Sequence, residues 1–143
     1  MPAQNVPIQA LLQPNGPVVA CLRSAFPNAL AIYAFGSRVT GQAGPDSDLD
    51  LAVLVAGYAD PLQLWQAAQP LAELAGCEVD LLDFRAASTV MQHQILTTGE
   101  RIWGDPLQAG LFEAFVLTEK LHLDEMRAGV LADIAKEGRV YGR

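Results

Sequence analysis

The chain has 143 residues, 51% of them hydrophobic, and carries a formal net charge of −7 at pH 7. This length fits one domain with a sizeable core, and the acidic balance argues against a protein that binds nucleic acid through a basic surface. The N-terminus has neither the basic start nor the unbroken apolar run of a signal peptide, and no apolar run is as long as a membrane span, so we expect a cytoplasmic protein that contacts neither membrane nor nucleic acid directly.

Strand-forming residues gather in short segments that are separated by glycines or by helix-like stretches. Each segment is rich in aliphatic, β-branched or aromatic residues, which favour a pleated, buried surface. The predicted strands are residues 29–35, 49–55 and 77–84, with a short last strand at 101–103. The alternation with helices indicates a small mixed sheet flanked by helices, an α/β or α+β fold.

Helices are predicted where apolar residues recur at helical spacing behind a start signal. Pro70 lies inside the second predicted helix and should bend or split it. Ser88 is a suitable cap for the third. The predicted helices are residues 17–26, 62–76 and 89–99.

The last third of the chain has the pattern of a helical tail. Asp105-Pro106 is a helix-start signal, and few helix breakers follow it. One helix of that length would span about 45–50 Å at 1.5 Å per residue, so it either breaks near residues 123–124 or projects from the domain. We therefore divide the chain into a core at 1–104 and a helical segment at 105–143, which either belongs to the same domain or docks a partner.

Acidic residues are concentrated between Arg38 and Arg85, an interval without Lys or Arg, and three of them alternate in the stretch DSDLDL at 46–51. Side chains alternate between the two faces of a strand. Asp48 and Asp50 therefore point to one side at the start of the second predicted strand, while its leucines point into the core. Two carboxylates on one face form a clamp for a hard cation such as Mg²⁺.

The turn before these carboxylates suits a ligand that carries phosphates. Gly36 allows the backbone to approach a ligand closely, and the Ser37 hydroxyl with nearby N–H groups could hold phosphates. Arg38 could either touch a phosphate or lie in solvent. A third carboxylate is expected as a metal ligand. Asp80 is the better candidate and Asp83 the alternative, which a regular strand would place on the opposite face.

Three other interpretations of this stretch can be tested on the residues. GSRVTGQA starts like a P-loop but lacks the Lys-Ser/Thr pair that phosphates and magnesium need. DSDLDL starts like an EF-hand loop, but Leu51 stands where that loop needs Gly, and Gly57 stands where it needs Glu. The third interpretation is purely structural and stays open: Asp48 and Asp50 form salt bridges with arginines.

Gly-Ser at 36–37, ten further residues and Asp-Leu-Asp at 48–50 resemble the signature of the polymerase-β-type nucleotidyltransferase superfamily. The hydrophobic strand before the signature and the later EVDLL strand agree with that family, and the resemblance covers residues 17–104. The small size is similar to that of the minimal MNT-type proteins, which are commonly the antitoxin partners of HEPN-domain ribonuclease toxins.

The resemblance implies a minimal nucleotidyltransferase fold with a C-terminal helical tail. It also implies that the chain transfers AMP from ATP to a tyrosine of a HEPN toxin encoded nearby and releases pyrophosphate. Asp50 would be the group closest to the attacking hydroxyl. By the same resemblance, the nucleotide would be bound by Gly36, Ser37 and Arg38, and two Mg²⁺ ions by the catalytic carboxylates Asp48, Asp50 and Asp80.

Two alternatives stay open. The chain could be an antitoxin that neutralises its partner by binding alone, with the helical tail as the docking element. It could also be a nucleotidyltransferase that acts on a small molecule of the aminoglycoside type, although 143 residues leave little room for the extra domain that such enzymes usually carry.

Overall fold

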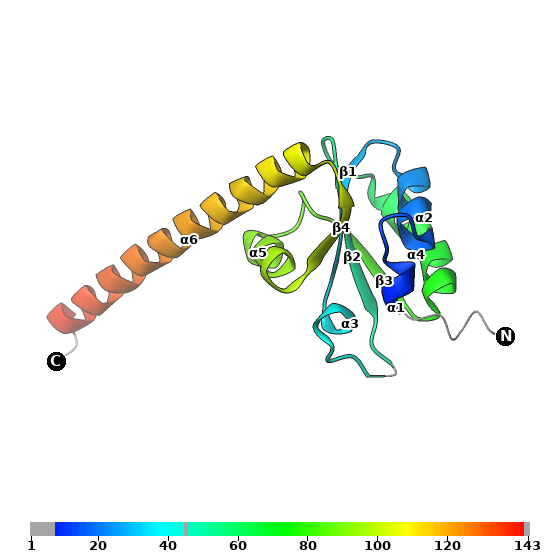
Figure 1. Ribbon diagram of the computed structural model, residues 1–143. Helices are drawn as coiled ribbons and strands as arrows, with labels where there is room; N and C mark the ends of the chain where they lie inside the picture. The colour runs from blue at the N-terminus through cyan, green and yellow to red at the C-terminus, as the bar shows by residue number, and fades with distance from the viewer. Residues whose placement is uncertain (1–7, 45, 142–143) are drawn as a thin grey trace.

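The computed structural model of the chain describes residues 8–44 and 46–141, and its centre is a four-stranded sheet (Figure 1). The strands lie in the order β3-β2-β1-β4. The strand β1 is antiparallel to both of its neighbours, whereas β2 and β3 are parallel. The sheet is therefore mixed, as predicted. Its strands are β1 (Ala29–Phe35), β2 (Leu49–Val55), β3 (Val79–Asp83) and β4 (Glu100–Gly104).

Several helices begin at a capping side chain, and the cap at Ser88 was predicted. The side chain of Asp60 accepts a hydrogen bond from the Leu62 N–H at 3.0 Å, and that of Ser88 accepts one from the Met91 N–H at 3.1 Å. Each bond satisfies one of the N–H groups that a helix start leaves without an intrahelical partner. The helices are α1 (Ile8–Leu11), α2 (Pro17–Ala25), α3 (Ser37–Thr40), α4 (Pro61–Ala75), α5 (Thr89–Thr98) and α6 (Pro106–Tyr141).

The structure departs from the sequence prediction in three places. Pro70 does not split α4, because the proline is on the exposed face while Ala67 and Leu71 beside it are buried and hold the helix against the body. The strand β3 is shorter than predicted. The short helices α1 and α3 were not predicted, since one turn is too short to show a helical period.

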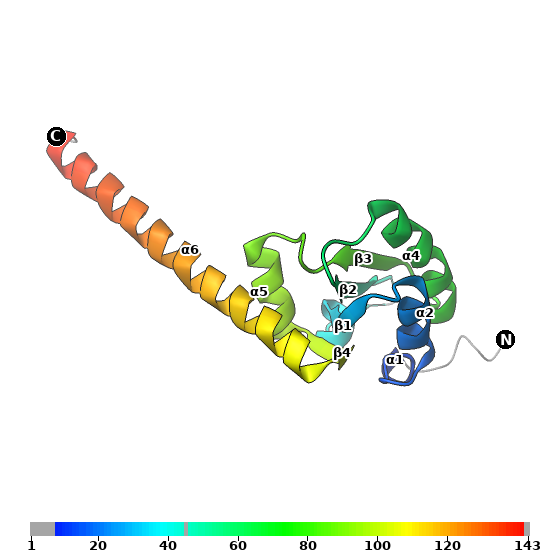
Figure 2. The same ribbon diagram turned by 90° about the horizontal axis from the view of Figure 1, so that it is seen from above.

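Helices cover both faces of the sheet, and Figure 2 shows α2 and α4 on one side with α5 and α6 on the other. The strand β2 shows why both faces are buried: Leu51 and Val53 alternate in position with Ala52 and Leu54, and all four side chains are inaccessible to solvent. The first pair packs towards α2 and α4, the second towards α5 and α6. The strand is therefore apolar on both faces for most of its length, which makes charged residues at its start conspicuous.

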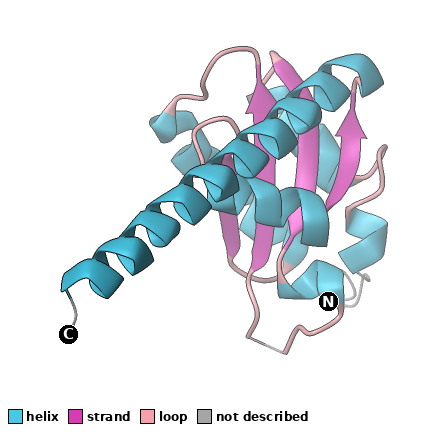
Figure 3. Cartoon of the chain, turned by 90° about the vertical axis from the view of Figure 1, so that its left-hand side faces the viewer, coloured by secondary structure: helices cyan, strands magenta, loops and turns pink. Residues whose placement is uncertain are grey.

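The helix α6 is one continuous helix that projects from the body, which is the second of the two alternatives that the sequence left open. At 1.5 Å per residue its 36 residues span about 54 Å. Its first turns are anchored by Ala109, Phe112 and Val116, which are buried against the sheet and α5. Figure 3 shows the helix crossing in front of the strands and continuing beyond them. No helix among residues 8–44 and 46–141 is long and apolar enough to cross a membrane.

Candidate active site

Three carboxylates lie near one another where β2 and β3 begin. Asp50 is paired with Asp80 across the parallel strands and with Phe35 on the other side. Residues paired directly across a sheet project to the same face, so both carboxylates point to the face that α5 and α6 cover further along. Asp48 lies two residues before Asp50 and is exposed. Asp80 and Asp48 thus lie near enough to Asp50 for their charges to act on its carboxylate.

The negative charges at this point oppose one another. Burial raises the pKa of Asp50, and the charges of Asp80 and Asp48 raise it further. Within the described residues, the side-chain salt bridges join Arg101 to Glu113 and Lys120 to Asp124. No arginine of that part of the chain neutralises Asp48 or Asp50, so the structural interpretation of these carboxylates finds no support.

Gly36 lies directly against the central carboxylate. Its backbone has φ +83°, and a Cβ at this position would overlap the carboxylate of Asp50. Only glycine adopts this conformation readily. The turn therefore depends on glycine for two reasons, backbone conformation and the space that Asp50 occupies.

The chain continues from Gly36 into the single turn of α3. The first N–H groups of a helix have no intrahelical partner, so those of Ser37 and Arg38 are available to a ligand beside Asp50. Successive N–H groups in such a turn favour anions. Gly36 and Ser37 thus lie where the sequence placed a phosphate-binding turn.

Arg38 makes a contact that the sequence did not predict. Its Nε donates to the carbonyl oxygen of Ser47 at 2.9 Å, and the Ser47 hydroxyl accepts from the Gly44 N–H at 2.8 Å. These bonds tie α3 to the loop that carries Asp48. Arg38 therefore braces the two halves of the site, and no local sequence signal could reveal this bond because it depends on the path of the loop.

Asp83, the alternative third carboxylate, lies elsewhere and has other partners. It is only 6% exposed and is paired with Val53, on the face opposite to Asp80. Its oxygens accept hydrogen bonds from the N–H groups of Ala59 at 2.8 Å and Arg85 at 3.0 Å. Asp83 therefore organises the loops at the other end of the strands and is not a neighbour of Asp50.

The carboxylate set fits magnesium by its chemistry. All three side chains offer oxygen, the ligand that Mg²⁺ prefers, and their mutual repulsion would be relieved by a cation. Within the described part of the chain, no three His, Cys, Asp or Glu side chains stand close enough together to hold a metal ion by themselves. Mg²⁺ commonly binds through one or two carboxylates and takes its other ligands from water and substrate phosphates, so an open set of this kind is suitable.

Comparison with known families gives one match over the body of the chain. Residues 20–106 match the family described as polymerase beta, nucleotidyltransferase. A curated relative, the protein adenylyltransferase MntA of Shewanella oneidensis MR-1, is 36% identical over 117 residues, which are 82% of this chain and 84% of that protein. The matched family region includes Gly36 and all three carboxylates.

Solved structures agree with the sequence matches. One is a crystal structure of a toxin–antitoxin with AMP-PNP, with a TM-score of 0.74 and 36% identity over 82% of this chain and 95% of that chain. Another is the tri-AMPylated Shewanella oneidensis HEPN toxin in complex with MNT antitoxin, with a TM-score of 0.68 and 34% identity over 82% of this chain and 92% of that chain.

Proposed function

The chain belongs to the polymerase beta nucleotidyltransferase family, and from this premise we propose that it is a magnesium-dependent antitoxin that transfers AMP from ATP to a tyrosine hydroxyl of a HEPN ribonuclease toxin. The observation that carries the proposal is the meeting of Asp48, Asp50 and Asp80 beside the glycine turn. The choice of nucleotide and acceptor is supported by one relative that is a protein adenylyltransferase, by one similar structure solved with AMP-PNP, and by another that contains an AMPylated HEPN toxin. The need for ATP places the proposed activity in the cytoplasm.

Each part of the site has a separate task in this reaction. Asp48, Asp50 and Asp80 would hold two Mg²⁺ ions, which when bound neutralise the triphosphate and polarise the α-phosphate. The N–H groups and the hydroxyl at Ser37 would hold the phosphates, with Gly36 leaving room for them. The carboxylate of Asp50 would take the proton of the tyrosine hydroxyl. The tyrosine oxygen then bonds to the α-phosphorus as the bond to pyrophosphate breaks.

The proposal is tested by intact-mass spectrometry of the HEPN-type protein encoded beside this chain, after incubation with ATP, Mg²⁺ and this chain. We expect the mass to increase by whole AMP units, and the increase to disappear when EDTA removes the metal. A neutralised toxin with no added mass would instead favour an antitoxin that acts by binding alone. Loss of the modified tyrosine by mutation should remove the corresponding AMP unit.

Replacing Gly36 by alanine is expected to lower the rate of AMP transfer by about a hundredfold or more, because the new methyl group displaces a carboxylate that acts on charge in the transition state. The unusual backbone conformation adds a stability cost of about 1–3 kcal/mol. Gly41→Ala is the control for a glycine of positive φ that touches no carboxylate. Gly41 has φ +84° and ψ 10°, the left-handed helical conformation, which strains alanine less than the ψ of −168° at Gly36, and a Cβ there meets no atom within 4 Å. Its rate should fall only a few-fold, and equal losses in the two variants would show that the overlap with Asp50 does not slow the transfer.

A further inference from the structure

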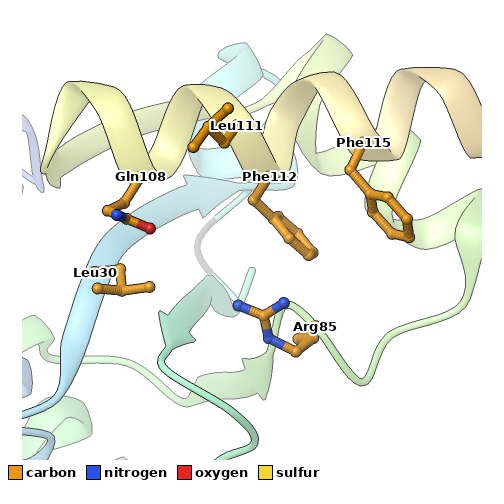
Figure 4. Close-up of a pocket in the computed structure, with 6 residues that line it drawn as sticks. All are labelled: Leu30, Arg85, Gln108, Leu111, Phe112 and Phe115. Carbon is orange, nitrogen blue, oxygen red and sulfur yellow. The ribbon is translucent and has the colours of Figure 1, made fainter.

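A hollow lies under the first turns of α6, at the end of the sheet away from the carboxylates (Figure 4). Leu30 stands near the start of β1 and Arg85 follows the end of β3, whereas Asp50 and Asp80 stand at the starts of β2 and β3. Figure 1 accordingly shows the start of α6 and the active-site helix α3 at opposite ends of the sheet. The hollow has a volume of about 270 Å³ and is lined by Leu30, Arg85, Gln108, Leu111, Phe112 and Phe115.

Arg85 is the only charged residue among those that line the hollow. Its Nε donates to the Gly57 carbonyl at 2.8 Å and its Nη2 to the Val55 carbonyl at 3.3 Å, while its guanidinium lies 4.9 Å from the centre of the Phe112 ring. These contacts fix the guanidinium in place. Within the described residues Nη1 has no acceptor, and no buried polar side-chain atom there lacks a partner, so Nη1 is reachable from solvent.

Four of the six residues that line the hollow are apolar, and two of these are well exposed to solvent. Leu111 is 60% exposed and Phe115 is 53% exposed, and they lie one helical turn apart on α6. Figure 4 shows both side chains on the stretch of α6 that runs above the Arg85 guanidinium. A fixed cation beside exposed leucine and phenylalanine complements a carboxylate that is next to an apolar side chain.

We propose that this hollow, called here the Arg85 hollow, docks a segment of the protein substrate in which an acidic residue adjoins a large apolar residue. The carboxylate would accept from Nη1 of Arg85 and the apolar side chain would pack on Leu111 and Phe115. The volume is below the range of about 300–1,000 Å³ that encloses small-molecule ligands, and an open, shallow hollow suits one anchoring side chain of a protein. The inference rests on the proposed function, since it assigns a docking site to the partner which that function requires.

The hollow and the carboxylates lie at different ends of the sheet, so binding of the partner and transfer of AMP can be changed independently. A partner that binds at the Arg85 hollow contacts the end of the sheet opposite to the carboxylates that act on ATP. Substitutions at the hollow should therefore raise the KM for the protein substrate and leave kcat nearly unchanged. Substitutions of Asp50 should lower kcat and leave the KM for the protein substrate nearly unchanged.

The test compares three exposed substitutions in calorimetric titrations of the HEPN-type protein encoded beside this chain. All three are placed in an Asp50→Asn background, so that binding is measured without turnover. Leu111→Asp removes an apolar wall and sets a competing carboxylate near Arg85, and we expect it to raise Kd by about tenfold or more. Leu111→Arg removes the same wall but adds a cation, so it should raise Kd by less.

Leu121→Asp is the control, because Leu121 is similarly exposed at 61% and lies ten residues, or about 15 Å, further along α6. The Kd of this variant should change by less than about twofold.

Equal weakening by Leu111→Asp and Leu121→Asp would overturn the assignment to the hollow. Equal weakening by Leu111→Asp and Leu111→Arg would overturn the recognition of a carboxylate, as would no weakening by either. The proposed function fails separately: if the unmutated chain adds no AMP to its partner, the binding comparison still decides whether the Arg85 hollow docks it. Leu111 and Leu121 are both exposed, so circular dichroism should show native folding in every variant.

Discussion

The Asp48→Asn/Asp50→Asn variant is expected to transfer AMP about a thousandfold more slowly than the unmutated chain, or not at all, and to unfold no more easily. The rate falls because asparagine keeps the size of aspartate but not the charge that holds Mg²⁺ against the triphosphate. Mass spectrometry of the partner, sampled over time, measures the rate. Asp46→Asn changes an exposed carboxylate in the same loop and should leave the rate within a few-fold.

The free energy of unfolding of this variant shows whether activity is lost because the metal ligands are gone or because the fold is damaged. Since burial and its two neighbours raise the pKa of Asp50 in the folded chain, the folded state holds this proton more tightly than the unfolded state. Stability contributed by the protonated form is present at low pH and is lost as pH rises through the raised pKa. At neutral pH without metal, the ionised group therefore costs stability that asparagine does not.

We consequently expect a melting temperature equal to or above that of the unmutated chain in EDTA at pH 7, and no gain on adding Mg²⁺. The unmutated chain should gain stability with Mg²⁺, because a cation that binds only the folded state stabilises it. A variant that melts earlier in EDTA would mean that the carboxylates support the fold, and the loss of activity would then say nothing about metal.

The central strands could be predicted from the sequence because their pattern is local. The runs 29–35 and 49–55 are β1 and β2 with the predicted bounds, since an apolar run ended by glycine is a sufficient signal for a strand buried on both faces. Predicting which carboxylates lie together required one further assumption. Asp80 could be chosen over Asp83 only by assuming a regular strand, and the pairing of Asp50 with Asp80 bears out that geometry.

The remainder could not be predicted because it depends on contacts between distant segments. The bond from Arg38 to Ser47 requires the loop to fold back on α3. The accessible Nη1 of Arg85 likewise depends on how the ends of β2 and β3 are placed relative to α6. The direction of α6 follows from packing, because Glu113 accepts hydrogen bonds from the Tyr33 hydroxyl at 2.6 Å and from Arg101 at 2.9 Å. The helix then continues through residues 123–124, where the ion pair of Lys120 with Asp124 at 2.7 Å joins successive turns.

Two substitutions in β3 are expected to have different effects: Asp80→Asn should lower the rate of AMP transfer, and Asp83→Asn should lower the free energy of unfolding. Asp80 is exposed beside Asp50 and accepts no hydrogen bond from another described residue. Its substitution should therefore lower AMP transfer by about a hundredfold or more and change the free energy of unfolding by less than about 0.5 kcal/mol. Asp83 is buried and accepts from two N–H groups, so asparagine there leaves one N–H facing an amide group and should cost about 1–3 kcal/mol.

The two variants are chemically identical changes three residues apart, so the comparison controls for the substitution itself. Urea denaturation measures the free energy of unfolding, and the rate of AMP transfer is measured well below the midpoint, where Asp83→Asn remains folded and should act at nearly the unmutated rate. If Asp83→Asn instead abolished transfer while Asp80→Asn did not, the third metal ligand would lie on the opposite face of β3. The phosphate-binding turn at Gly36 would then be on the wrong side of the sheet to serve it, and the proposed reaction would have to be abandoned.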